Sequence, residues 1–222
     1  MKIKAIITGS TGMVGKGILL ECLEREEVES VLVINRKPLG LVHPKLKEIL
    51  HPDFSDFSII KEEFTNYNAC FHCMGVSSIG KTEDEFLIPT YNFTKALVDE
   101  MNAIKSNMVF NYVSGSGTDS SELGNIMWAR VKGKTENMIL NAGFKDAYMF
   151  RAGMILPEKG VKSSTGWYNS IYVILKPFFP FFKKMNSVTT SVKIGDAMIN
   201  SVCKGSEKKH LENQDINTLA NQ

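Results

Sequence analysis

The sequence predicts an α/β protein built on a doubly wound parallel sheet, and three observations support this prediction. Over residues 1–150, apolar runs of strand length alternate with segments of helical periodicity. A glycine-rich run, Thr8–Gly15, separates the first of these strands from the first helix. The chain has 222 residues, 43% hydrophobic and 23% charged, which suits one soluble domain with a sizeable core. Because strands that alternate with helices form right-handed parallel βαβ units, we expect a single domain over residues 1–222.

Several apolar runs have the length and composition of buried strands. We expect strands at Ile3–Ile7, Val31–Ile34, Leu46–His51, Ala69–Gly75, Met108–Val113 and Ala147–Phe150. Between the first two strands, Val14, Ile18 and Cys22 recur at helical spacing and predict the first helix. Further helices are expected at Asp56–Phe64, Glu83–Ile104, Leu123–Asn141 and Val192–Cys203, and a tail at Leu211–Ile216 closes the chain.

The alternation stops after Arg151. The segment Ile171–Phe182 is strongly apolar, but it is too short to cross a membrane and is interrupted by Lys176 and Pro177. It could lie in a bilayer interface or cover a substrate pocket. Because small-molecule pockets are mostly apolar, we favour a substrate lid over residues 156–191.

Composition limits the classes of partner. The formal net charge of +2 gives no strong attraction for nucleic acid. The sequence has no uninterrupted apolar run of about 18 residues, and we expect no signal peptide. We therefore expect a cytoplasmic protein, monomeric or homodimeric, that acts on a small-molecule substrate and does not bind nucleic acid.

Two cysteines form a C-x-x-C motif, but the motif lies in a predicted strand. Because successive side chains of a strand point to opposite faces, the thiols of Cys70 and Cys73 should diverge. We therefore favour core packing over a zinc or dithiol site. The four histidines are scattered along the chain, and we predict no metal site.

The run Thr8–Gly15 has the spacing G-x-x-G-x-x-G between a strand and a helix, the context in which such runs bind dinucleotides. Gly9 permits a tight turn, Gly12 lets the backbone approach a pyrophosphate, and Gly15 allows close packing of the helix on the sheet. The helix N-terminus presents free N–H groups to the anion. The sequence therefore predicts a Rossmann-type site that includes Gly9, Ser10, Thr11, Gly12, Met13, Val14 and Gly15.

The end of the second strand indicates which dinucleotide binds. A carboxylate there accepts a hydrogen bond from the ribose 2′-hydroxyl of NAD and repels the 2′-phosphate of NADP. Here the chain reads Ile34-Asn35-Arg36-Lys37, with two cations and no carboxylate. A guanidinium can bind phosphate through two parallel hydrogen bonds and stack on adenine. We therefore predict NADP as the cofactor, held by Arg36 and Lys37, although Lys37 could instead belong to a basic surface turn.

The chain resembles the atypical short-chain dehydrogenases/reductases of the NAD(P)-binding epimerase/dehydratase-like family, and within them the group of the oxidoreductase-like Tat-interacting protein. The resemblance rests on the glycine run, Cys73-Met74-Gly75, Val131–Glu136, Phe150–Gly153 and Leu211–Asn213. It implies a bond from an Asp after the third strand to the adenine amine, and a glycine near the nicotinamide carboxamide. The implied cofactor contacts are Asp53, Phe54, Cys73, Met74, Gly75, Lys132, Arg151, Ala152 and Gly153.

The resemblance also implies a catalytic set, and here the chain departs from the family. Members place a Ser or Thr after the fifth strand and a Tyr-x-x-x-Lys segment in the next helix; the phenol transfers the proton and the lysine tunes its pKa. Ser114 or Ser116 takes the serine place and Lys132 the lysine place, but the tyrosine place is Trp128. An indole N–H donates a hydrogen bond but exchanges no proton near neutral pH. The usual proton relay is therefore absent.

Three explanations of Trp128 remain open. Another group, such as Tyr112, Ser116 or Tyr168, supplies the proton in a remodelled site. Alternatively, the hydride acceptor needs no acid from the protein. In the third explanation, the protein binds NADP without turnover and acts as a redox sensor or scaffold. We expect an oxidoreductase or a nucleotide-sugar epimerase-like enzyme, with the non-catalytic regulator as the alternative.

Overall fold

The computed structural model describes residues 2–104, 107–161, 179–183 and 185–222. In these residues a seven-stranded parallel sheet has the order β3-β2-β1-β4-β5-β6-β9. The strands are β1 (Ile3–Thr8), β2 (Val28–Asn35), β3 (Leu46–Leu50), β4 (Ala69–His72), β5 (Val109–Val113), β6 (Asp146–Arg151) and β9 (His210–Glu212). The strand order reverses between β1 and β4, which is where open α/β sheets bind ligands at their carboxyl ends.

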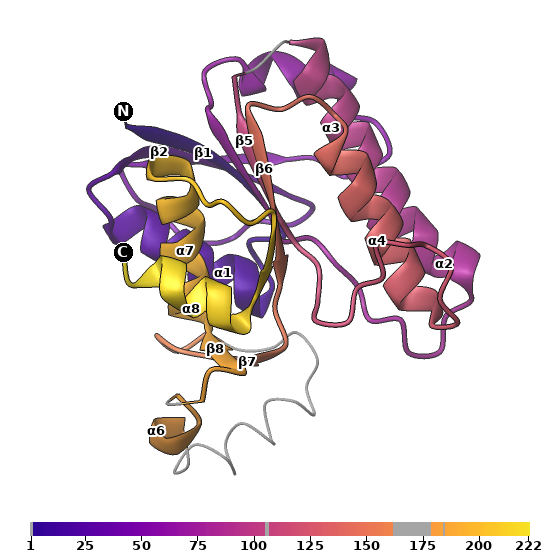
Figure 1. Cartoon of the computed structure of the whole chain (residues 1–222). Helices are drawn as coiled ribbons and strands as arrows, with labels where there is room; N and C mark the ends of the chain where they lie inside the picture. Colours follow the sequence, from indigo (N-terminus) through magenta and orange to yellow (C-terminus); the bar gives the residue numbers. More distant parts are fainter. Residues whose placement is uncertain (1, 105–106, 162–178, 184) are drawn as a thin grey trace.

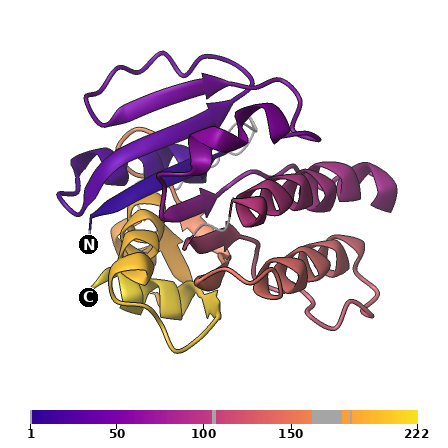
Figure 2. The ribbon, with the colours of Figure 1, turned by 90° about the horizontal axis from the view of Figure 1, so that it is seen from above.

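Helices cover both faces of this sheet (Figure 1). One face carries α1 (Met13–Glu24), α7 (Ser191–Cys203) and α8 (Asn213–Ala220). The other carries α2 (Glu83–Leu87), a π-helical turn (Ile88–Asn92), α3 (Phe93–Ala103) and α4 (Met127–Leu140). The helices α3 and α4 lie side by side in both views (Figures 1 and 2). The predicted doubly wound α/β fold is therefore confirmed.

Each face of the sheet has its own apolar layer. Ile3, Ala5 and Ile7 of β1 belong to the layer under α1, α7 and α8, whereas Ile6 belongs to the layer under α3. The same alternation separates the two cysteines of the C-x-x-C motif. Cys70 packs in the second layer and Cys73 against the first, and both thiols are free. Cys70 therefore packs in the core as predicted, whereas Cys73 is only partly buried at the end of β4.

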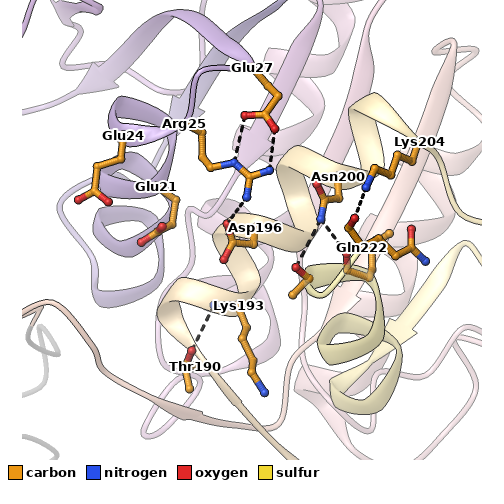
Figure 3. A network of polar contacts seen from close by, with 12 residues as sticks. Glu21, Glu24, Arg25, Glu27, Thr190, Lys193, Asp196, Asn200, Lys204 and Gln222 are labelled. Atoms are coloured by element: carbon orange, nitrogen blue, oxygen red, sulfur yellow. Dashed lines mark hydrogen bonds and ion pairs between the residues drawn. The ribbon is translucent and has the colours of Figure 1, made fainter.

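Polar contacts tie the helices of the first face together (Figure 3). Arg25, just after α1, donates to Glu27 at 2.9 Å and to Asp196 of α7 at 3.0 Å. Asn200 of α7 donates to the carbonyl oxygen of Leu219 in α8 at 2.9 Å. These contacts fix α7 and α8 against each other and against α1, so the short strand between α7 and α8 is held beside β6.

That short strand corrects the prediction for the C-terminal residues. The sequence predicts only a tail at Leu211–Ile216, but the structure forms β9 there and continues into α8. Glu212 and Asp215 form a reciprocal capping box that starts α8 directly after the strand. Three residues of strand are too few to show the period-two alternation that sequence analysis depends on.

The helix predicted at Leu123–Asn141 also begins later than expected, at Met127. The carboxylate of Asp119 accepts hydrogen bonds from the backbone N–H of Ser121 at 2.9 Å and of Gly124 at 2.7 Å. Those bonds stabilise a loop over residues 119–124, because an Asp side chain that binds nearby N–H groups competes with helix formation.

The predicted lid at residues 156–191 stays a prediction. Residues 162–178, with Tyr168 and most of the apolar segment Ile171–Phe182, lie outside the described residues. The described parts of this region include β7 (Met154–Leu156), which pairs in parallel with β8 (Val188–Thr190), and α6 (Phe179–Phe182). None of the helices in the described parts of the chain has the length and apolar character that a membrane span requires.

Candidate cofactor-binding and active site

The glycine run forms a tight loop between β1 and α1. Gly9 has a φ of +73°, and a Cβ there would lie 2.7 Å from the backbone of Cys73 and Met74. A Cβ on Gly15 would lie 2.2 Å from the carbonyl oxygen of Gly9. Only glycine fits these two positions, which bring the loop against both the end of β4 and the first turn of α1. Gly12 differs, because a Cβ there would make only an ordinary contact, 3.4 Å from the Gly9 carbonyl oxygen.

A cavity of about 610 Å³ opens in front of this loop, at the carboxyl ends of β1, β2 and β4. This volume lies within the range of about 300–1,000 Å³ that is usual for small-molecule sites. The guanidinium carbon of Arg36 lies 6.0 Å from the ring centre of Phe54, and the two side chains form part of the wall. The lining residues are Gly9, Thr11, Gly12, Ile34, Asn35, Arg36, Lys37, Phe54, Cys73, Met74 and Gly75.

Several predicted cofactor residues do not line this cavity. Asp53 is directed to its own turn, where its carboxylate accepts from the backbone N–H of Ser55 at 2.9 Å and from its hydroxyl at 2.5 Å. These hydrogen bonds hold the pKa of Asp53 below its ordinary value. Met13 and Val14 lie in the first turn of α1, and Val14 packs against the core. Arg36 and Phe54 thus lie at the cavity, whereas Asp53 lies beside it.

A chain of polar side chains leads from the glycine loop through Asn35, at the cavity wall, to Glu48. The hydroxyl of Ser10 donates to Asn35 at 2.8 Å, and the Asn35 amide donates to Glu48 of β3 at 2.7 Å. Glu48 also accepts from the backbone N–H of Leu39 at 2.9 Å. The chain therefore connects the glycine loop with the loop that carries Arg36. Sequence analysis missed Glu48, because nothing in a short, half-exposed strand marks this carboxylate as a partner of Asn35.

A second polar group of residues lies at the ends of β5 and β6. Glu136 of α4 is fully buried and accepts from the Ser114 hydroxyl at 2.5 Å. Arg151 donates to the same carboxylate through Nε at 3.1 Å and through Nη2 at 2.5 Å. Ser114 and Arg151, both predicted to serve the substrate or the cofactor, thus have side chains bound to Glu136. In the sequence, the one indication that Glu136 is their shared partner is its position one helical turn after Lys132 on the same face.

Trp128 and Lys132 lie one turn apart on α4 and face the loop after β5. Two ring atoms of Trp128 lie 4.0 Å and 3.5 Å from where a Cβ would stand on Gly115 and Gly117. The Nζ of Lys132 lies 3.8 Å from the same point on Gly115, and it donates to the carbonyl oxygen of Ser114 at 2.5 Å. Burial lowers the pKa of Lys132 to about 8, although the charge of Glu136 opposes the shift.

The loop after β6 completes this group. The backbone N–H of Ser116 donates to the carbonyl oxygen of Ala152 at 3.3 Å, and the Ser116 side chain is exposed. Gly153 is also exposed, and its N–H donates to Asn213 at 3.0 Å. The structure thus brings Ser116, Trp128, Lys132 and Gly153 together around one loop. Sequence analysis quoted Asn213 as part of a motif but gave it no role.

Tyr112, an alternative proton donor in the sequence analysis, is 1% exposed. Its ring lies 5.6 Å from that of His72, and Tyr112 belongs to the apolar layer under α3. Burial raises its pKa above the ordinary value. Tyr112 therefore packs in the core and does not face the loop at Gly115. Tyr168, the other tyrosine considered, lies outside the described residues.

No protein-family model matches this chain. Among solved structures, it is similar to Bordetella bronchiseptica WbmF in complex with NAD⁺ and UDP, with a TM-score of 0.71, 14% identity, and coverage of 99% of this chain and 77% of the other. It is also similar to a short-chain dehydrogenase from Burkholderia cenocepacia in complex with NADP, with a TM-score of 0.69, 13% identity, and coverage of 98% and 92%. These likenesses show that the chain has the Rossmann fold of NAD(P)-binding short-chain dehydrogenases.

Curated relatives carry the name FMP52, mitochondrial. The protein of Candida albicans is 28% identical over 171 residues, which cover 74% of this chain and 72% of the relative. The protein of Meyerozyma guilliermondii is 24% identical over 171 residues, which cover 77% and 72%. These names contradict the predicted cytoplasmic location. That prediction depended on finding no signal peptide or membrane span, and neither observation excludes an organelle.

Proposed function

We propose that this protein binds NADP in the cavity at β1, β2 and β4 and is an oxidoreductase without a tyrosine acid. The observation that carries the proposal is the wall of the cavity, where Arg36 and Lys37 follow an asparagine that is directed away to Ser10 and Glu48. A 2′-phosphate finds two cations there and no lining carboxylate. The solved neighbours that hold NAD⁺ or NADP support a nicotinamide dinucleotide in general.

The residues present fit such a cofactor. Gly12, which lines the cavity, and the N-terminus of α1 suit a pyrophosphate, and Phe54 with Arg36 suits an adenine ring. At the other end, Lys132 would hold the nicotinamide ribose beside the loop at Gly115. A bound NADPH supplies a hydride, and the exposed Ser116 hydroxyl offers a hydrogen bond to a substrate carbonyl. We propose two narrower versions of this function: membership of the Tat-interacting protein group, and an epimerase-like reaction on a nucleotide sugar.

One observation favours a second function, that of a non-catalytic NADP-binding sensor or scaffold. Trp128 replaces the family's tyrosine, and its indole transfers no proton near neutral pH. A protein that keeps the dinucleotide cavity and loses this acid could use the bound cofactor only as a signal.

An acceptor screen separates the two functions. NADPH binding is measured by cofactor fluorescence, and NADPH oxidation is followed with aldehydes, quinones and nucleotide sugars as acceptors. The oxidoreductase predicts binding together with oxidation for at least one acceptor class. Binding without oxidation by any acceptor supports the sensor, and no binding at all refutes both. Because the FMP52 relatives are named mitochondrial, acceptors available in that organelle come first.

A further inference from the structure

The proposed reduction needs a proton, and the loop at Gly115 has few groups that can supply it. The hydroxyl of Ser114 donates to Glu136 and is turned away. Tyr112 is buried in the core, and the indole of Trp128 exchanges no proton. The hydroxyl of Ser116 is exposed, but a serine O–H is a far weaker acid than an ammonium group. Among the described residues at this loop, Lys132 is left as the titratable group.

Among the described residues, Lys132 has no ion pair of its own. The charge that acts on it is that of Glu136 on its own helix, and Arg151 of β6, His210 of β9 and Tyr112 of β5 surround Glu136 in turn. Arg151 binds Glu136 through two nitrogens, and the His210 ring lies 3.4 Å from the same carboxylate. The described hydrogen bond of the Lys132 ammonium goes instead to the neutral carbonyl of Ser114. A carbonyl partner leaves two ammonium hydrogens available for a ligand.

We propose that Lys132 is itself the proton donor, in place of the tyrosine whose position Trp128 occupies. The inference rests on the proposed reductase function. A bound NADPH would supply the hydride to the carbonyl carbon of the acceptor and would itself be left as NADP⁺. Nζ of Lys132 gives its proton to the carbonyl oxygen, which takes up the electron pair of the C=O π bond, so the acceptor becomes an alcohol. The neutral amine of Lys132 then regains a proton from water.

The lowered pKa of Lys132 suits this role. With a pKa of about 8, the side chain is mostly ammonium at neutral pH and can both lose and regain a proton. An exposed lysine, with a pKa of about 10.4, is a weaker acid by roughly two pH units. Because the protonated form is the donor, reduction should fall as the pH rises through about 8.

The test uses Lys132→Arg, because a guanidinium keeps the positive charge but donates no proton at these pH values. The matched control is Lys134→Arg on the exposed side of the same helix, where the ammonium lies over the Tyr91 ring.

NADPH affinity, the pH dependence of NADPH oxidation and the ¹³C NMR titration of labelled lysine Cε atoms are measured for each. We expect Lys132→Arg to keep NADPH affinity within about threefold, because the guanidinium can still donate to the ribose that Lys132 is proposed to hold. It should lose about a hundredfold in turnover and lose the decline near pH 8. In the NMR titration, one lysine with a midpoint near 8 should vanish in Lys132→Arg and persist in Lys134→Arg.

Two results overturn the inference and leave the reductase function intact. One is wild-type turnover in Lys132→Arg with an unchanged pH profile. The other is a Lys132 resonance that titrates together with the exposed lysines. A wild type that binds NADPH but oxidises none with any acceptor refutes the reductase function and the proton transfer together. The two failures are thus distinguished by the wild-type measurement alone.

Discussion

The two ends of the sheet's carboxyl edge differ in what their polar groups contact. At β1, β2 and β4, backbone and side chains surround an open cavity, and the polar chain from Ser10 to Glu48 passes through Asn35 at its wall. At β5 and β6, the polar side chains bind one another, with Ser114 and Arg151 both directed to Glu136. The first end depends on the shape of the backbone, and the second on individual side chains.

This difference teaches why one end tolerates few substitutions while the other can vary. Gly9 and Gly15 admit no side chain, so most substitutions there disrupt the loop itself. At position 128 the chain accommodates an indole, which lies against Gly115 and Gly117, and the ion pair of Glu136 and Arg151 is present beside it. The proposed dinucleotide end is therefore constrained by packing, whereas the proposed catalytic end can accept different side chains.

The largest expected effect is that of Gly12→Val at the dinucleotide end. The φ of Gly12 is −79°, which any residue adopts, and its Cβ has space, so the protein should fold normally. The new side chain occupies the space proposed for the pyrophosphate, and NADPH affinity should fall by about a hundredfold or more, equivalent to about 3 kcal/mol. Cofactor fluorescence measures the affinity, and far-UV circular dichroism reports the fold.

The matched variant is Gly15→Ala, whose Cβ would lie 2.2 Å from the Gly9 carbonyl oxygen. It should lose binding and also about 1–3 kcal/mol of stability, because overpacking strains the loop. If Gly12→Val binds NADPH like the wild type, the phosphates lie elsewhere and the proposed register of the cofactor is wrong.

Arg36→Ala should remove most of the preference for NADPH over NADH. Losing a charge-assisted contact with the 2′-phosphate should cost about 1.5–3 kcal/mol, or roughly ten- to a hundredfold in NADPH affinity. NADH affinity should change little, and Lys81→Ala, an exposed lysine that does not line the cavity, is the control. Equal affinity of the wild type for the two cofactors would contradict the role of Arg36.

Acidification should weaken the fold through His72, at the end of β4. Thr94 donates its hydroxyl hydrogen to the Thr90 carbonyl, so it accepts from Nε2 of His72, and Nδ1 accepts from Thr8. This buried neutral ring has a pKa lowered by burial to about 3, against 6.5 in the unfolded chain. The stabilisation by the neutral form is complete above pH 6.5 and is lost as the pH falls toward 3.

At pH 5 this loss amounts to about 2 kcal/mol relative to pH 7. Urea unfolding at the two pH values measures it, and His72→Gln, which can still donate and accept, should flatten the difference. An unchanged pH dependence in His72→Gln would show that other groups cause the acid sensitivity. A confirmed effect would separate the acid sensitivity of the fold, due to His72, from the proposed loss of activity above pH 8, due to Lys132.

The same comparison explains how much the sequence could predict. The glycine run, Arg36 and Phe54 are local signals, because each acts within a few residues of a strand end, and the structure places all of them at one cavity. Asp53 shows the limit, because a carboxylate two residues before a serine can bind its own turn instead of a ligand. Position along the chain does not reveal whether the carboxylate of Asp53 binds its own turn or a ligand.

The proposed catalytic end was harder to predict because its partners come from separate elements. The hydroxyl of Ser114 meets Glu136 across 22 residues, and Gly153 meets Asn213 across 60. No sequence spacing encodes such pairs. Sequence analysis therefore predicted Ser114 and Arg151 as site residues, although their side chains bind Glu136. The substitution of Trp128 was visible in the sequence, but the burial that sets the pKa of Lys132 was not.

The smallest expected effect is that of Trp128→Phe, and it probes the catalytic end most directly. If Lys132 donates the proton, the indole serves only as packing against Gly115 and Gly117, and the variant should keep turnover within about threefold of wild type. The smaller ring leaves a gap beside the loop, so a modest rise in KM is expected from looser positioning.

Trp128→Tyr is the informative companion, because it adds a phenol one helical turn from Lys132. With a second acid present, the decline of activity near pH 8 should become shallower in Trp128→Tyr and stay unchanged in Trp128→Phe. The measurement is NADPH oxidation by both variants from pH 6 to 10 with the acceptor that the screen identifies. Loss of turnover in Trp128→Phe with unchanged NADPH binding would show that the indole takes part in the chemistry, and that the catalytic end depends on Trp128 as much as on Lys132.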